Sequence, residues 1–166
     1  MRNQRFFIGD YRVAMTPEIS TALTDVPPAR VPSPTGQKNA KNSCKQLKLT
    51  LEARHFGGAV VLHCEGRIVF HSEARALSTV VTKILPSTRR MIVDLAAVDS
   101  VDSAGLGELV LTHMWAEAAG YTLKFASPRK SVRRLFEITN LVSVLDVYAS
   151  VPEAMVAMAQ EEVLSA

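Results

Sequence analysis

The chain has 166 residues, a length typical of one domain plus a tail and sufficient for one hydrophobic core. Its net charge of +3 is unevenly spread: residues 1–48 carry +5 and residues 49–166 carry −2, which argues against a nucleic-acid-binding core. Two cysteines are too few for a disulfide framework or a four-cysteine zinc site, and no apolar run reaches the roughly 18 residues of a membrane span, so we expect a reduced cytoplasmic protein.

The first 45 residues differ in composition from the rest of the chain. Pro27-Pro28 and Pro32-Ser33-Pro34 are followed by a polar stretch over residues 35–39. Such a segment buries too little apolar surface to offset the entropy of ordering its backbone. We therefore expect a disordered, basic, Pro-rich tail over residues 1–45 and a folded domain over residues 46–166.

A hairpin and a helix are predicted next. Apolar and polar residues alternate over residues 47–53, which indicates a half-buried strand. His55–Gly58 reads as a turn and Ala59–Cys64 as a second strand. Ser72 is a plausible N-cap, and we expect Pro86 to end the helix that follows. The core face of this helix repeats at helical spacing through Leu77, Val80, Val81, Ile84 and Leu85.

The most informative stretch is a buried strand followed by a sharp turn into a helix. Met91–Leu95 is a continuous apolar run except for one carboxylate, as expected of a strand buried on both faces. A helix is predicted over residues 104–119, with Gly120 at its C′ position. Ser103 then lies at or near the helix N-terminus beside Asp102. A hydroxyl group in this position is well placed to be switched by a phosphate.

The remaining elements complete an alternating pattern. Thr122–Ala126 is a predicted strand, and the next helix opens with Pro128 at its first position and ends at Asn140. Val144–Val147 is a short predicted strand, and Ser150–Glu153 has the spacing of a capping box for the last helix. The order β-β-α-β-α-β-α-β-α predicts an α/β domain with a mixed, largely parallel sheet covered by about four helices. The expected core faces of the two last helices are Val132, Leu135, Phe136 and Ile138, and Ala154, Met155 and Met158.

Residues from about 47 to 164 resemble the STAS domain of bacterial anti-sigma factor antagonists. The resemblance covers about two-thirds of the chain, and its most specific part is an Asp-Ser-x-Gly turn between a strand and a helix. The matching motifs are Val93-Asp94-Leu95, Val98, Asp102–Gly107, Gly120, Val132–Thr139, Asn140-Leu141, Val147-Tyr148 and Glu153-Ala154. One departure is Val69, where many members of the family carry an Asp.

This resemblance implies a small non-enzymatic protein with no cofactor or metal of its own. Its partner would be an anti-sigma factor that is also an ATP-dependent serine kinase, with the ATP bound by that partner. Ser103 would be the phosphoacceptor, and the unphosphorylated form would capture the anti-sigma factor. No nucleic acid or membrane is implied, and we expect a monomer or weak dimer. The implied partner-binding residues are Asp99, Asp102, Ala104, Gly105, Leu106 and Gly107.

The chemistry of such a switch can be stated from the residues. A helix N-terminus favours an anion, so a phosphate on Ser103 should be tolerated, particularly beside the amides of Gly105 and Leu106. Its added charge of about −1.5 to −2 would lie near Asp99 and Asp102 and oppose docking. We further expect Gly105 and Gly107 to keep the first turn bare, with Leu106 as an exposed or half-exposed anchor.

Other interpretations of these residues remain open. Ser103 fits a simple helix N-cap equally well on local pattern. Asp94 is expected at the end of its strand or accepting hydrogen bonds from the turn. Asp99 and Asp102 are a poor match to an acid–base pair or a metal site, because no His or further carboxylate lies nearby in sequence. A basic stripe on the penultimate helix indicates a solvated face or a docking surface for an acidic partner: Arg129, Lys130, Arg133 and Arg134.

Two rival functions can be weighed. Val101–Gly105 has the outline of a hydrolase nucleophile elbow, but Val101 stands where the motif needs Gly. The only His after Ser103 is His113, which lies on the same predicted helix and too early to follow a separate acid. The second rival is a STAS scaffold subunit of a larger signalling assembly that does not act on a sigma factor. Copurification of a kinase or of a large oligomer would separate these alternatives.

Overall fold

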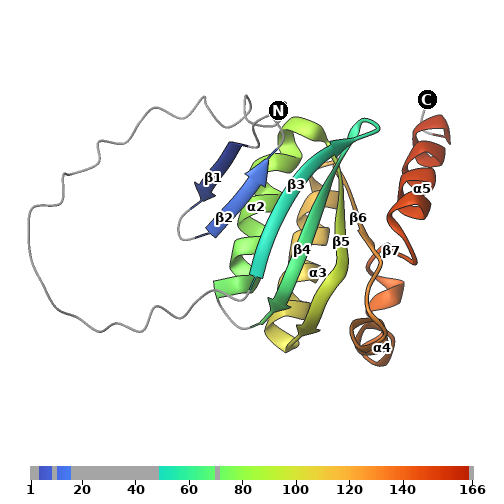
Figure 1. Ribbon diagram of the computed structural model, residues 1–166. Helices are drawn as coiled ribbons and strands as arrows, with labels where there is room; N and C mark the ends of the chain where they lie inside the picture. The colour runs from blue at the N-terminus through green and yellow to red at the C-terminus, as the bar shows by residue number, and fades with distance from the viewer. Residues whose placement is uncertain (1–3, 9–10, 16–48, 70–71, 165–166) are drawn as a thin grey trace, which may run out of the picture.

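The computed structural model describes residues 4–8, 11–15, 49–69 and 72–164 (Figure 1). Within these ranges, seven strands form a single sheet whose spatial order follows the chain from β1 to β7. The strands are β1 (Gln4–Ile8), β2 (Tyr11–Met15), β3 (Leu49–Phe56), β4 (Ala59–Ile68), β5 (Arg90–Val101), β6 (Thr122–Ala126) and β7 (Val147–Tyr148). The helices are α2 (Ser72–Thr88), α3 (Ser103–Ala118), α4 (Lys130–Ile138) and α5 (Val151–Leu164), with a 3₁₀ turn, η1, over Leu141–Ser143.

The predicted mixed, largely parallel sheet is confirmed. Strands β3 and β4 pair antiparallel as the expected hairpin, and β4–β5, β5–β6 and β6–β7 are parallel. The hairpin turn is shorter than predicted, because β3 continues through Phe56 and only Gly57 and Gly58 lie outside the strands. Both glycines have positive φ, +55° and +80°, which is what a two-residue turn between twisted strands requires.

Two strands lie inside the segment predicted to be a disordered tail. Strands β1 and β2 pair antiparallel, and β2 pairs parallel with β3, so that they extend the sheet beyond the hairpin. The sequences RFFI and YRVAM are rich in residues that favour strands. The prediction of a disordered tail rested instead on the proline-rich stretch that follows them. The proline-rich stretch itself lies outside the described residues.

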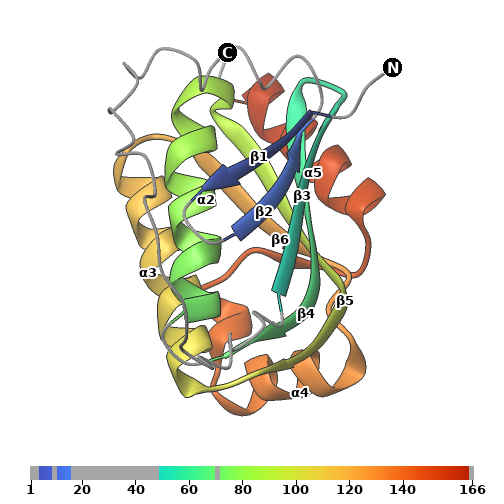
Figure 2. The same ribbon diagram turned by 60° about the vertical axis from the view of Figure 1, so that its left-hand side comes forward.

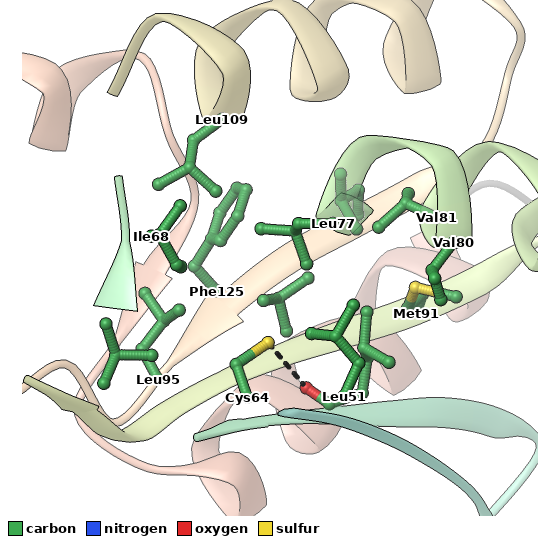
Figure 3. Packing of buried hydrophobic residues seen from close by; sticks show 14 of the residues in the cluster. Leu51, Cys64, Ile68, Leu77, Val80, Val81, Met91, Leu95, Leu109 and Phe125 are labelled. Atoms are coloured by element: carbon green, nitrogen blue, oxygen red, sulfur yellow. Dashed lines mark hydrogen bonds between the residues drawn. The ribbon is translucent and has the colours of Figure 1, made fainter. Parts of the chain in front are cut away.

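The sheet is covered on both faces (Figures 1 and 2). Helices α2 and α3 lie side by side on one face, and α5 lies on the other. The alternation along β5 accounts for this: Met91 and Val93 belong to the large core under α2 and α3, whereas Ile92 packs with Ala154 and Met158 of α5. Figure 3 shows the large core, in which side chains of β3, β4, β5 and β6 meet those of α2 and α3.

Three boundaries differ from the predictions. Helix α2 continues two residues past Pro86 to Thr88, and the Arg89 N–H then donates to the Leu85 carbonyl at 2.7 Å. Pro86 falls in the last turn, where a missing N–H removes a single helical bond. Helix α4 begins at Lys130, so Pro128 precedes it rather than occupying its first position. The expected Val144–Val147 strand is also wrong, because η1 precedes a β7 that spans only two residues.

The core faces of α4 and α5 are largely as predicted. Val132 and Phe136 are buried on the inner face of α4, but Ile138 is 73% exposed at the end of the helix. In α5, Ala154 and Met158 are buried. One half of the predicted capping box is present, because the Glu153 N–H donates to Ser150 Oγ at 3.3 Å. The Glu153 side chain reaches one residue further back than predicted, since its Oε2 accepts from the Ala149 N–H at 3.3 Å.

Candidate functional site

Ser103 is the first residue of α3 and its side chain is exposed at the end of β5. The helix cap is supplied by the preceding residue: Asp102 has extended backbone angles and its Oδ1 accepts from the Gly105 N–H at 2.8 Å. The interpretation of Ser103 as the N-cap is therefore wrong. Within the described part of the chain, no hydrogen bond occupies the Ser103 hydroxyl, so the cap and the candidate phosphoacceptor are separate residues.

The same turn corrects the expected role of two backbone amides. The Gly105 N–H donates to the Asp102 side chain, and the Leu106 N–H donates to the Asp102 carbonyl at 2.8 Å. Both amides are thus already used inside the helix start and are not available to a phosphate on Ser103. The positive electrostatic potential of the helix N-terminus still favours such a phosphate.

Gly105 is required for close packing rather than for an open surface. A Cβ at this position would lie 2.3 Å from the Ile68 carbonyl oxygen and 2.9 Å from a methyl group of Val101. The Ile68 carbonyl also accepts from the Asp102 N–H at 3.3 Å, so the last residue of β4 holds the start of α3 in place. The expectation that Gly105 keeps the surface bare is wrong, whereas Gly107 is exposed, and a Cβ added there would meet nothing within 4 Å.

Leu106 is buried, with 7% of its surface exposed, and belongs to the large core. The expectation that it forms an exposed anchor is wrong, because its position on α3 points it toward the sheet instead of outward. Ala104 is half-buried. The outer surface at this end of α3 therefore consists of Ser103 and Gly107, with Ala104 at its edge.

Asp99 forms a contact that the sequence did not indicate. Its exposed carboxylate pairs with Arg129, whose Nε also donates to the Ala96 carbonyl at 3.0 Å. Arg129 immediately precedes α4, so this pair joins α4 to the end of β5, at the end of the molecule where α3 begins (Figures 1 and 2). The two residues are 30 positions apart, and no local pattern predicts their contact.

Asp94 lies within β5 and not at its end, which corrects one of the two expected placements. Its Oδ2 lies 2.9 Å from His63 Nδ1 on the neighbouring strand, and its Oδ1 accepts from the Ala96 N–H at 3.1 Å. These partners satisfy a carboxylate whose side chain is only 15% exposed. Together with burial of the thiol, which is the larger cause, the Asp94 charge raises the pKa of Cys64 far above its ordinary value.

A buried lysine on the α5 face was also missed. Lys124 in β6 is fully buried, and its ammonium group donates to Glu161 at 2.6 Å and to Asp146 and Tyr148 at 3.2 Å. Burial by itself lowers the pKa of Lys124, but the hydrogen bonds to Glu161, Tyr148 and Asp146 and the Asp146 charge raise it well above its ordinary value. The cluster joins α5 to the sheet, away from Ser103. The signal in the sequence that could have indicated this cluster is a Lys within an otherwise largely apolar strand, because a buried charge needs partners.

The geometry does not support an activated serine. His113 lies ten residues after Ser103 on the same helix, which is about 15 Å along the axis and beyond hydrogen-bond reach. Its ring is buried against Phe125, with ring centroids 6.1 Å apart. Across the described ranges, His, Cys, Asp and Glu form no cluster of three that could hold a metal ion. The described helices likewise include none with the length and apolar character needed to cross a bilayer.

Residues 50–154 match the family model of the STAS domain. The chain belongs to the STAS domain family. Among solved structures, an anti-sigma factor antagonist from Mycobacterium paratuberculosis is similar over 66% of this chain and 92% of that one, at 21% identity and a TM-score of 0.59. The antagonist SpoIIAA in its unphosphorylated form is similar over 67% and 97%, at 19% identity and a TM-score of 0.54. The Bacillus cell fate determinant SpoIIAA in its phosphorylated form matches over 66% and 99%, at 16% identity and a TM-score of 0.50. At these identities the structural likeness establishes the STAS fold.

Proposed function

We propose that this STAS domain is an anti-sigma factor antagonist, a binding module without catalytic activity of its own. In its unphosphorylated form it captures an anti-sigma factor that is also a serine kinase, and it thereby regulates transcription. Phosphorylation of Ser103 by that kinase, with ATP bound by the kinase, ends the capture. The observation that carries the proposal is an exposed serine hydroxyl at the first residue of α3, next to a helix cap supplied by another residue.

The solved relatives support this proposal through their own described roles. Two of them are anti-sigma factor antagonists, and SpoIIAA exists in unphosphorylated and phosphorylated forms. In the present chain, the family's Asp-Ser-x-Gly turn corresponds to Asp102–Gly105. A kinase must bring its ATP γ-phosphate to an accessible oxygen, and the exposure of Ser103 meets that requirement.

The proposed contact surface has an outer and an inner part. Ser103, Ala104, Gly107 and Asp99 would contact the partner, since they lie at or near the surface of one end of the domain. Asp102, Gly105 and Leu106 would act from beneath: they cap the helix, hold it against β4 and anchor it in the core. Mutations in the second group would therefore affect binding through the position of α3.

A phosphate would act mainly on the partner and not on the domain. It adds a charge of about −1.5 to −2 at a surface that carries Asp99, which is paired with Arg129, and that lies above the capping carboxylate of Asp102. Like charges brought together at a desolvated contact cost several kcal/mol. Because each ~1.4 kcal/mol changes affinity tenfold, we expect phosphorylation to weaken binding by about 10²-fold or more.

The test compares two substitutions at one position. The anti-sigma factor kinase that copurifies with the native protein is titrated with wild type, Ser103→Ala and Ser103→Asp. We expect Ser103→Ala to bind as wild type does and to resist phosphorylation, and Ser103→Asp to bind at least tenfold more weakly. Equal affinities for the two variants, or absence of phosphate at Ser103 in mass spectra after incubation with the kinase and ATP, would contradict the proposal. Copurification of a large STAS assembly without a kinase would favour the scaffold alternative.

A further inference from the structure

Helix α3 is apolar around nearly its whole circumference, yet one face is exposed. Its 16 residues, SAGLGELVLTHMWAEA, contain two acidic residues, Glu108 and Glu117, and no Lys or Arg. A helix that is hydrophobic all round is normally buried on all sides. Here α3 packs against α2 and the sheet, with its outer side uncovered by any described helix (Figure 2). The exposed side therefore resembles a surface that another protein covers.

The exposed apolar side chains lie in line with Ser103. Positions 103, 107, 111 and 114 fall on one face of a helix with 3.6 residues per turn, over a length of about 16 Å. Leu111 is 63% exposed and Met114 is 55% exposed, and Trp115 at the edge of this face is 37% exposed. Trp115 is held in place by the Tyr121 ring, 5.7 Å away between centroids. We call Gly107, Leu111, Met114 and Trp115 the α3 stripe.

We propose that the α3 stripe is the apolar half of the surface that binds the kinase-type anti-sigma factor, continuous with Ser103 at its N-terminal end. This inference rests on the proposed function and extends it, because it places most of the buried apolar contact one to three turns beyond the phosphoacceptor. The partner would present an apolar groove about three helical turns long. Ser103 would then control docking at one end, and the stripe would supply affinity along the rest of the helix.

The area of the stripe argues against a second copy of this chain as its occupant. A stable, specific interface buries about 800 Å² on each partner, whereas one fully buried aromatic side chain contributes only about 150–250 Å². Three side chains that are each only partly exposed fall short of that area. They continue the exposed surface around Ser103 along α3, and this continuity points to the partner proposed for Ser103 as the occupant of the stripe.

The residues before β3 are a poor complement to this stripe. Residues 16–48 contain no aromatic residue and no Met. Apolar grooves that accept Leu, Met and Trp side chains are typically lined by large hydrophobic and aromatic residues. Other exposed apolar residues, Val156 and Val163, lie on α5 across the sheet and do not extend the stripe.

Site-specific photocrosslinking in the native cells tests the contact directly. The full chain carries p-benzoylphenylalanine at position 111 in the stripe, at position 104 beside the phosphoacceptor, or at position 163 on α5 as a control. Mass spectrometry identifies each adduct. We expect positions 111 and 104 to capture the same ATP-binding kinase and position 163 to capture none of it, and we expect Ser103→Asp to remove both adducts.

The outcomes separate this inference from the proposed function. Capture of the kinase from position 104 but not from position 111 overturns the inference and leaves the proposed function standing. Failure of both positions to capture a kinase, with Ser103→Asp having no effect, overturns both. An adduct from position 111 with a second copy of the chain, or with its own first 48 residues, also overturns the inference.

A quantitative comparison follows with the purified kinase and the full chain. Leu111→Gln and Met114→Gln are each expected to raise Kd at least tenfold, and the matched α5 variant Val163→Gln is expected to leave Kd within twofold. Since Leu111 and Met114 are more than half exposed, their variants should unfold at the wild-type temperature, which separates lost binding from lost folding. Trp115 is the single tryptophan of the chain, so its emission should shift to shorter wavelength in the complex. An unchanged Kd for both stripe variants with unchanged unfolding would refute the inference.

Discussion

Replacing two glycines in the same turn of α3 by Ala should change stability in opposite directions. At Gly107 a Cβ meets nothing within 4 Å, so the change removes only the entropic cost of a glycine in a helix. That cost is about 0.5–1 kcal/mol, and Gly107→Ala should be stabilising by about this amount. At Gly105 the same Cβ would lie 2.3 Å from the Ile68 carbonyl oxygen, about 0.7 Å inside the shortest separation that real Cβ atoms show.

The cost at Gly105 follows from what the clash would displace. The obstructing atom is backbone, and the same carbonyl accepts the Asp102 N–H, so moving it weakens the bond that fixes the start of α3. Overpacking in a tight site costs about 1–3 kcal/mol, which exceeds the propensity gain of Ala over Gly. We therefore expect Gly105→Ala to be destabilising by about 1–2 kcal/mol, and the free energies of unfolding of the two variants to differ by about 1.5–3 kcal/mol.

Urea denaturation followed by circular dichroism measures this difference. Gly107→Ala should raise the urea midpoint, Gly105→Ala should lower it, and both should keep the wild-type m-value. Gly105→Ala should also weaken partner binding, because it shifts Ser103 with the helix start, whereas Gly107→Ala tests the outer surface alone. A Gly105→Ala protein as stable as Gly107→Ala would show that the β4–α3 contact is looser than described and would refute this reasoning.

The remaining predictions concern the helix cap, the lysine cluster and the buried thiol. Asp102→Ala should lower the free energy of unfolding, measured in urea, by about 1 kcal/mol, whereas Asp102→Asn should keep most of the wild-type stability, since Asn is an equally good N-cap. Equal losses of stability in both variants would show that the carboxylate charge matters more than the cap. Because the folded-state pKa of Lys124 is raised, its contribution to stability should persist up to the ordinary lysine pKa of about 10.4 and be lost as pH rises through the folded value. Glu161→Gln should therefore be less stable than wild type at neutral pH, and its free energy of unfolding should fall less than that of wild type as the pH becomes alkaline. In a Cys44→Ser background, a thiol reagent should label Cys64 only after urea unfolding, since burial keeps the thiol protonated and inaccessible; fast labelling of the native protein would contradict this.

Much of the site could be predicted because its signals are local. A buried apolar strand followed by Asp-Ser-x-Gly places a serine at the start of a helix, and the structure confirms that order within one residue. The same local pattern could not decide whether Asp102 or Ser103 caps the helix, because both side chains are good caps. The flanking glycines also suggested too much exposure for Leu106, because the local sequence does not show which side of a nearly all-apolar helix faces the core.

Local sequence was enough to define the order of the main strands and helices from β3 to α5, the presence of the hairpin and the position of Ser103, because each depends on residues within a few positions of one another. The Asp99–Arg129 pair, the Lys124 cluster and the contact of Gly105 with the end of β4 came instead from the way the chain folds. These contacts join residues more than 20 positions apart in the chain. Their energies depend on burial and distance, which are defined only once the sheet has brought its elements together. The exposed α3 stripe belongs to the same group. Its residues are visibly apolar in the sequence, but only the tertiary structure shows that no other described element covers them.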